Sequence, residues 1–267
     1  MKQTYANLTF DIEDRVACVT FRREKDTNAF SRGMTLDLME VCRLVVEDGR
    51  ASEPSIDALV LTGGVGRSFS VGGDFHDVSA LAEEGEIRSY LGEIIDLYIS
   101  ILQVEIPVVA AIDKFAIGQG LQVALMTDWR IGTDACRLQM PELKNGVACP
   151  LGSVILEFLL GRATMLELIL DCDFLDAQAS RALRLLQQIT PATELADVAR
   201  ARAKQFQAYP RTSFVATKRI QNERFITALE SVREASSRAH VDAFLRKTGK
   251  KHFEKILGRT QAGGGGA

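Results

Sequence analysis

Two glycine-containing turns, each close behind a short apolar stretch, constrain this chain more than any other feature. The apolar stretches cover residues 58–61 and 108–112, and the turns TGGVGRSFSVGGDF (62–75) and FAIGQG (115–120) follow them. A buried strand, a glycine turn and a helix in succession are typical of α/β folds. Because this order occurs twice, we predict an α/β core in which the two turns are the first candidates for a binding site.

The remaining periodicity divides the chain into three parts. Apolar and polar residues alternate over residues 8–12, and 16–21 reads as the partner strand of a hairpin. Ser31 is placed to cap a helix, a long amphipathic helix is expected over 87–101, and short strands are expected near 129–131 and 137–140. After residue 150 the pattern is mostly helical. We therefore expect an α/β core over residues 1–195, a helical region over 196–258 and a flexible Gly-rich tail over 259–267.

Composition argues against several functional classes. The 267 residues contain 32 basic and 35 acidic side chains, which disfavours a dedicated nucleic-acid binder. Five scattered cysteines form no disulfide framework, and three separated histidines make a His-rich metal centre unexpected. The N-terminus lacks an apolar signal segment, and no apolar run reaches the ~20 residues of a membrane helix. We expect a cytoplasmic protein with reduced thiols, no membrane contact and no bound metal.

The glycine turns suggest binding through backbone N–H groups. The first turn lacks both the GK[ST] ending of a Walker motif and the GxGxxG order, so it gives little support for a nucleotide site. In the second, Gly118 and Gly120 flank Gln119 at the start of an expected helix, where the Gln119 N–H would lie at the positive end. Paired with an N–H from the first turn, it would form a two-donor oxyanion hole. Ordinary strand-to-helix turns remain the alternative.

Three sequence blocks resemble the crotonase (enoyl-CoA hydratase/isomerase) superfamily in order and spacing. They are SFSVGGDF (68–75), IPVVAAIDKFAIGQGLQVALMTDWRI (106–131) and MPELKNGV (140–147). The resemblance implies an α/β fold, a spiral of ββα units with a C-terminal helical trimerisation region. It also implies an acyl-CoA substrate, no permanently bound cofactor, and a homotrimer or dimer of trimers.

The resemblance also implies which residues bind the substrate. The backbone N–H groups of Gly73 and Gln119 fall at the two oxyanion-hole positions. The family's adenine-binding backbone falls on Val71, Asp74 and Phe75. Contacts with CoA are further implied for Lys25, near its phosphates, and for Phe244 and Lys247, which match positions that reach the CoA of a neighbouring subunit.

One position departs from the family's hydratases. They use two glutamates to handle water; the second is Glu142 here, but the first falls on Gln122. A carboxamide does not exchange protons at neutral pH, so the usual acid/base pair is broken and ordinary hydration is disfavoured. Two reaction classes remain: isomerisation with a single carboxylate, and decarboxylation of a malonyl thioester, which needs the oxyanion hole first.

Further segments resemble the carboxymethylproline synthases of carbapenem biosynthesis, among them ALMTDWR (124–130), MPELKNGVACPLGSVIL (140–156) and YPRTSFVATKR (209–219). That resemblance implies decarboxylation of malonyl-CoA, addition of the enolate to pyrroline-5-carboxylate and hydrolysis of the thioester. Glu142 would handle the hydrolytic water, Gln122 would match a glutamine, and His240 would lie near the site. Tyr90 replaces a tryptophan in the substrate pocket, and Gln119 replaces a methionine. The alternatives are an enoyl-CoA isomerase, a simple malonyl-CoA decarboxylase and a non-catalytic acyl-CoA-binding protein.

Overall fold

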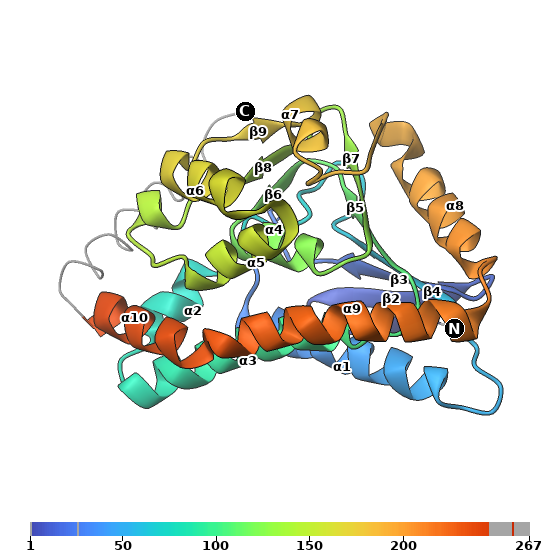
Figure 1. Ribbon diagram of the computed structural model, residues 1–267, viewed down its shortest axis with the longest axis horizontal. Helices are drawn as coiled ribbons and strands as arrows, with labels where there is room; N and C mark the ends of the chain where they lie inside the picture. Colours follow the sequence, from blue (N-terminus) through green and yellow to red (C-terminus); the bar gives the residue numbers. More distant parts are fainter. Residues whose placement is uncertain (1, 26, 246–257, 259–267) are drawn as a thin grey trace.

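A seven-stranded sheet forms the centre of the computed structural model, which describes residues 2–25, 27–245 and 258 (Figure 1). The first three strands pair antiparallel, and every later pairing in the sheet is parallel. The hairpin predicted from residues 8–21 is present. The strands, in sheet order, are β1 (Lys2–Thr4), β2 (Leu8–Glu13), β3 (Val16–Phe21), β4 (Ala58–Thr62), β5 (Val108–Ile112), β7 (Trp129–Thr133) and β10 (Gln188–Thr190).

A second, three-stranded sheet contains part of the second glycine turn and fixes its position. It contains β6 (Phe115–Ile117), β8 (Arg137–Gln139) and β9 (Leu175–Asp176). β6 pairs in parallel with β8, and β8 pairs antiparallel with β9. The sequence assigned residues 115–117 to a turn, whereas they form a strand. Three residues are too few to show a period, so only the pairing with β8 identifies this strand.

The helices that the sequence predicts individually are present. Ser31 caps α1 (Arg32–Gly49) by accepting a hydrogen bond from the Met34 N–H, as expected. The long amphipathic helix is α3 (Glu84–Leu102), and the short helix after the second glycine turn is α4 (Gln119–Leu125). The other helices are α2 (Phe75–Ala80), α5 (Pro150–Leu160), α6 (Arg162–Asp171), α7 (Ala177–Ala182), α8 (Leu195–Gln207), α9 (Arg211–Ser231) and α10 (Arg233–Leu245).

The C-terminal helices contact the core in two ways. Leu195, Ala199 and Ala203 of α8 pack against small and branched side chains of the central sheet, forming a cluster separate from the main core. In contrast, α9 and α10 contact α3 and α5 (Figure 1). The boundary predicted after residue 195 therefore falls at the start of a helix that packs on the sheet. Of the three helices that follow it, α9 and α10 are the ones that pack on other helices.

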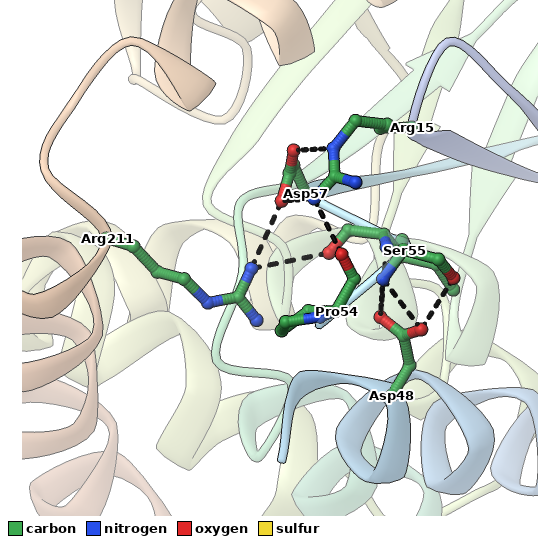
Figure 2. Close-up of polar contacts among 7 residues, drawn as sticks. Arg15, Asp48, Pro54, Ser55, Asp57 and Arg211 are labelled. Carbon is green, nitrogen blue, oxygen red and sulfur yellow. Dashed lines mark hydrogen bonds and ion pairs between the residues drawn. The ribbon is translucent and has the colours of Figure 1, made fainter. Parts of the chain in front are cut away.

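A polar network ties the start of α9 to the sheet. Asp57, just before β4, accepts hydrogen bonds from Arg15 in the β2–β3 turn and from Arg211 at the start of α9 (Figure 2). Below it, the Asp48 carboxylate accepts bonds from the Ser55 backbone and hydroxyl (Figure 2). Because these residues come from four separate segments, the network fixes where α9 begins its path across α3. None of the described helices has the length and apolar character needed to cross a bilayer.

Candidate active site

The two glycine turns lie side by side. The Ser70 N–H donates to the Phe115 carbonyl at 3.1 Å, and the Ile117 N–H donates back to the Ser70 carbonyl at 3.0 Å. Close packing depends on Gly120, since a β-carbon there would lie 2.5 Å from the Ser70 carbonyl oxygen. The second turn also needs Gly118, whose φ of 52° is costly for any residue with a β-carbon. The two turns are far apart in the sequence, yet together they form one wall of a cavity.

Two backbone N–H groups on this wall are available to a ligand. Gly73 and Gln119 both line one cavity of about 150 Å³, and neither N–H donates to another residue in the part of the chain that the structure describes. The Gln119 N–H starts α4, so its partial positive charge is unopposed by an intrahelical acceptor. Two free donors bordering one cavity are what the stabilisation of an oxyanion requires.

The rest of the cavity is largely apolar and comes from distant elements. α3 and α10 contribute one side, and the segment between β8 and α5 contributes another. A mostly apolar lining lowers the local dielectric and so strengthens the polar contacts beside it. The apolar lining includes Val71, Phe75, Val78, Leu91, Ile94 and Val147.

A chain of hydrogen bonds orients the one carboxylate in the cavity lining. The buried Tyr98 hydroxyl donates to Gln122 Oε1 at 2.8 Å, and Gln122 Nε2 donates to Glu142 Oε1 at 2.7 Å. Because a carboxylate accepts hydrogen bonds, the amide group of Gln122 must face Glu142 with its NH₂. Gln122 therefore holds Glu142 in place and offers it no exchangeable acidic proton. The sequence predicted that these two residues face one site, and the structure brings them together.

Burial changes the acidity of Glu142. The residue as a whole is partly exposed, but its Oε2 atom is enclosed and makes no hydrogen bond within the described structure. Loss of hydration raises the pKa of Glu142 to about 7, although contacts with Gln122 and the Cys149 thiol oppose the shift. A carboxyl group that titrates near neutral pH is suited to accept and return a proton.

This pKa predicts a measurable effect on stability. Between pH 4.5 and about 7 the unfolded chain loses the Glu142 proton before the folded chain does, so stability falls as the pH rises. The full difference corresponds to about 3 kcal/mol. Since glutamine stays neutral, we expect Glu142→Gln to stabilise the protein against urea clearly more at pH 8 than at pH 5. Glu167→Gln, on an exposed face of α6, is the control. An equal gain at both pH values would contradict the raised pKa.

Cys149 and His240 are also titratable and line the same cavity. Burial and the nearby Glu142 charge raise the pKa of the Cys149 thiol, which stays protonated. The Nδ1 atom of His240 lies 2.7 Å from the Ser236 carbonyl oxygen and must donate to it, because a carbonyl only accepts. Burial lowers the pKa of His240, so the ring is neutral at pH 7. The placement of His240 at the cavity agrees with its predicted position near the site.

Comparison with known proteins now decides the family. The enoyl-CoA hydratase/isomerase family profile matches residues 11–260. The chain belongs to this family. A carboxymethylproline synthase from Pectobacterium carotovorum subsp. carotovorum is 37% identical over 92% of this chain and 96% of the relative.

Solved structures agree with the crotonase fold. ThnE from S. clavuligerus is 30% identical, with a TM-score of 0.72, and the match covers 85% of this chain and 97% of that one. Human mitochondrial delta3-delta2-enoyl-CoA isomerase, at 19% identity, has a TM-score of 0.87 over 97% of this chain and 100% of its own. The crotonase resemblance and the α/β fold class predicted from the sequence are therefore confirmed.

The residues expected to contact CoA lie in different environments. Val71 and Phe75 line the cavity, whereas Asp74 lies behind it, where it caps α2 and pairs with Arg23 at 2.5 Å. The N–H groups of Val71 and Asp74 already donate to backbone carbonyls, and the Asp74 carbonyl accepts from the Val78 N–H, so of these two residues Val71 offers its carbonyl oxygen to a ligand. Lys25 is exposed and outside the cavity lining.

Phe244 lines the cavity of its own chain, where its side chain is buried and packs edge-on against His240. It lies there because α10 folds back against α3. Its expected contact with the CoA of a neighbouring subunit stays a prediction. Lys247 lies outside the described residues. No group of three His, Cys, Asp or Glu within the described ranges is arranged to hold a metal ion.

Sequence reasoning missed two residues that shape this crotonase site. Tyr98 recurs at helical spacing among apolar residues, which indicates only a core position, yet its hydroxyl fixes the Gln122 amide. Cys149 gave no signal because lone cysteines are most often inert core residues. Its place beside the Glu142 carboxylate becomes visible only when α5 packs against α4.

Proposed function

We propose that this protein is a carboxymethylproline synthase, which joins a malonyl-CoA-derived enolate to pyrroline-5-carboxylate for carbapenem biosynthesis. The observation that carries the proposal is the bond from Gln122 Nε2 to Glu142 Oε1, which leaves a single carboxylate where hydratases need two. A relative of that name, 37% identical over nearly the whole chain, supports it. We also propose that the protein acts in the cytoplasm as a homotrimer or dimer of trimers.

The first step requires only backbone donors. The thioester carbonyl oxygen of malonyl-CoA accepts bonds from the Gly73 and Gln119 N–H groups. The bond between the α-carbon and the carboxylate then breaks, carbon dioxide leaves, and the electron pair becomes an enolate. The charge that develops on the oxygen is stabilised by the two donors, and no proton needs to move.

The second step forms a carbon–carbon bond. The enolate α-carbon attacks the imine carbon of pyrroline-5-carboxylate bound in its protonated form, and the electron pair of the C=N bond moves to the nitrogen, which becomes a neutral ring amine. Water that reached the site would instead protonate the enolate to acetyl-CoA. The apolar lining from α2 and α3 supports the coupling because it excludes bulk water during the lifetime of the enolate.

The last step is hydrolysis of the thioester. Glu142 accepts a proton from water, and the resulting hydroxide adds to the carbonyl carbon. When the tetrahedral intermediate collapses, the bond to sulfur breaks, and CoA leaves as the thiol after taking the proton back from Glu142. The same N–H groups hold the oxyanion of this tetrahedral intermediate. The position of Glu142 supports this role, because a β-carbon placed on Gly118 would lie 3.2 Å from Glu142 Oε1, next to the donor turn.

A two-substrate assay tests the proposal. Purified protein with malonyl-CoA and pyrroline-5-carboxylate is expected to give carboxymethylproline, free CoA and carbon dioxide, detected by mass spectrometry. Acetyl-CoA as the only product would identify a simple decarboxylase. Migration of a double bond in an enoyl-CoA substrate, without malonyl-CoA turnover, would identify an isomerase. Binding of acyl-CoA with no turnover would identify a non-catalytic binding protein, and each of these three results would overturn the synthase.

A further inference from the structure

Two polar side chains beside the first donor turn lack a partner. A β-carbon placed on Gly73 would lie 3.2 Å from Gln119 Oε1 and 3.4 Å from the Tyr90 hydroxyl oxygen, so the two groups converge on the same point. Tyr90 is 6% exposed and Gln119 is 8% exposed, and both line the cavity. Neither side chain forms a hydrogen bond with any residue that the structure describes.

Packing alone does not explain this pair. The polar ends of both side chains are not among the fully enclosed unpartnered atoms of the described structure, so they reach the open space of the cavity. A ligand that displaces water from them must supply hydrogen-bond partners in its place, which an apolar side chain at either position would not require. The neighbours of Tyr90 on the cavity face of α3, Leu91 and Ile94, are indeed apolar. Two unpartnered polar groups that converge beside an oxyanion donor therefore indicate that a bound molecule supplies the missing partner.

The position of the pair limits which group that is. A ligand whose thioester oxygen binds the Gly73 N–H presents its α-carbon substituents to the same part of the wall. Burial raises the pKa of the Tyr90 phenol, so the hydroxyl stays protonated and acts as a donor. The Gln119 carboxamide also offers two N–H donors once its amide is turned. These two neutral groups can therefore donate hydrogen bonds to a substituent of the acyl chain that carries several oxygen atoms.

We propose that Tyr90 and the Gln119 side chain bind the carboxylate of the malonyl group. This rests on the proposed function and deepens it by assigning the subsite that distinguishes malonyl-CoA from other CoA esters. The described cavity lining contains no lysine or arginine. A cation would stabilise the carboxylate and oppose its loss, whereas neutral donors orient it while the bond to the α-carbon breaks and carbon dioxide leaves.

The test compares two CoA esters that differ only in that carboxylate. For wild type, Tyr90→Phe, Gln119→Met and Gln119→Glu, we would measure kcat and KM for decarboxylation of malonyl-CoA alone, and the inhibition constant of acetyl-CoA. Each of the three substitutions is expected to raise KM for malonyl-CoA roughly tenfold or more, because a hydrogen bond to a charged group is lost. The affinity for acetyl-CoA should change less than about threefold, within the range of small packing effects.

The Gln119→Glu variant gives the clearest result. It keeps the shape of Gln119 and adds a negative charge that repels the carboxylate of malonyl-CoA, which acetyl-CoA lacks. Tyr209→Phe, on an exposed tyrosine outside the cavity, is the matched control, and thermal melting verifies folding. Equal losses for both esters, or no loss, would overturn the carboxylate subsite while wild-type activity still supports the synthase. A wild-type protein that does not decarboxylate malonyl-CoA would overturn the proposed function itself.

Discussion

Replacing Glu142 with alanine is expected to block release of the free acid while leaving carbon–carbon bond formation in place. In the proposed mechanism the variant loses the group that takes a proton from water, and general base catalysis typically contributes 10²–10⁴-fold. The proposed decarboxylation uses the backbone donors of Gly73 and Gln119, which the substitution leaves in place. We therefore expect carboxymethylprolyl-CoA to accumulate, with free-acid formation slowed at least about 100-fold, the lower end of that range.

Single-turnover experiments with mass-spectrometric detection separate the two steps. They follow loss of malonyl-CoA and appearance of the thioester and the free acid in the same sample. Glu167→Ala, which removes an exposed carboxylate of α6, is the matched control and should behave as wild type. Release of free acid at the wild-type rate from Glu142→Ala would rule out the proposed role of this carboxylate in hydrolysis.

A Gly120→Ala variant is expected to lose decarboxylation, the earlier step. The new β-carbon would lie 2.5 Å from the Ser70 carbonyl oxygen, so one of the two turns must move. Ser70 leads directly into Val71–Gly73, and Gly120 follows Gln119, so the movement separates the two N–H donors. Loss of one oxyanion-hole donor lowers kcat by about 10²–10³-fold in other enzymes, and we expect an effect of this size.

The rate of carbon dioxide release from malonyl-CoA measures this effect. Gly85→Ala, in the first turn of α3, meets no atom within 4 Å and is the matched control. Thermal unfolding of each variant measures how far the substitution lowers the stability of the whole fold. If Gly120→Ala folds and keeps the wild-type rate, the donor pair does not support catalysis as proposed.

The sequence predicts local elements well because their causes are local. Ser31 and the spacing of apolar residues after it are enough to locate α1, and Asp74 caps α2 as its position before a helix suggests. The facing of Gln122 and Glu142 could also be predicted, although only the family resemblance related a helix residue to one twenty positions later. Their direct hydrogen bond also shows how the Gln122 amide is oriented toward Glu142, which the spacing of residues in the sequence does not reveal.

What the sequence does not predict depends on packing between distant segments. The convergence of Tyr90 and Gln119 beside Gly73 results from α3 lying against the donor turns. The burial of Phe244 in its own chain's cavity results from α10 folding back on α3. The pKa of Glu142 likewise depends on how completely the surrounding segments exclude water. Such effects can be seen only in the three-dimensional structure, because they depend on contacts between segments that are far apart in the sequence.

The contribution of α10 to the cavity links the docking of this helix to the occupancy of the site. The second donor turn is held by the bond from the Gly118 N–H to the Gln139 carbonyl and by the pairing of β6 with β8, whereas His240 and Phe244 come from α10. If α10 undocks from α3, the donor turns therefore remain but one wall of the cavity is lost. A ligand that contacts this wall binds the docked form and so stabilises the docking of α10.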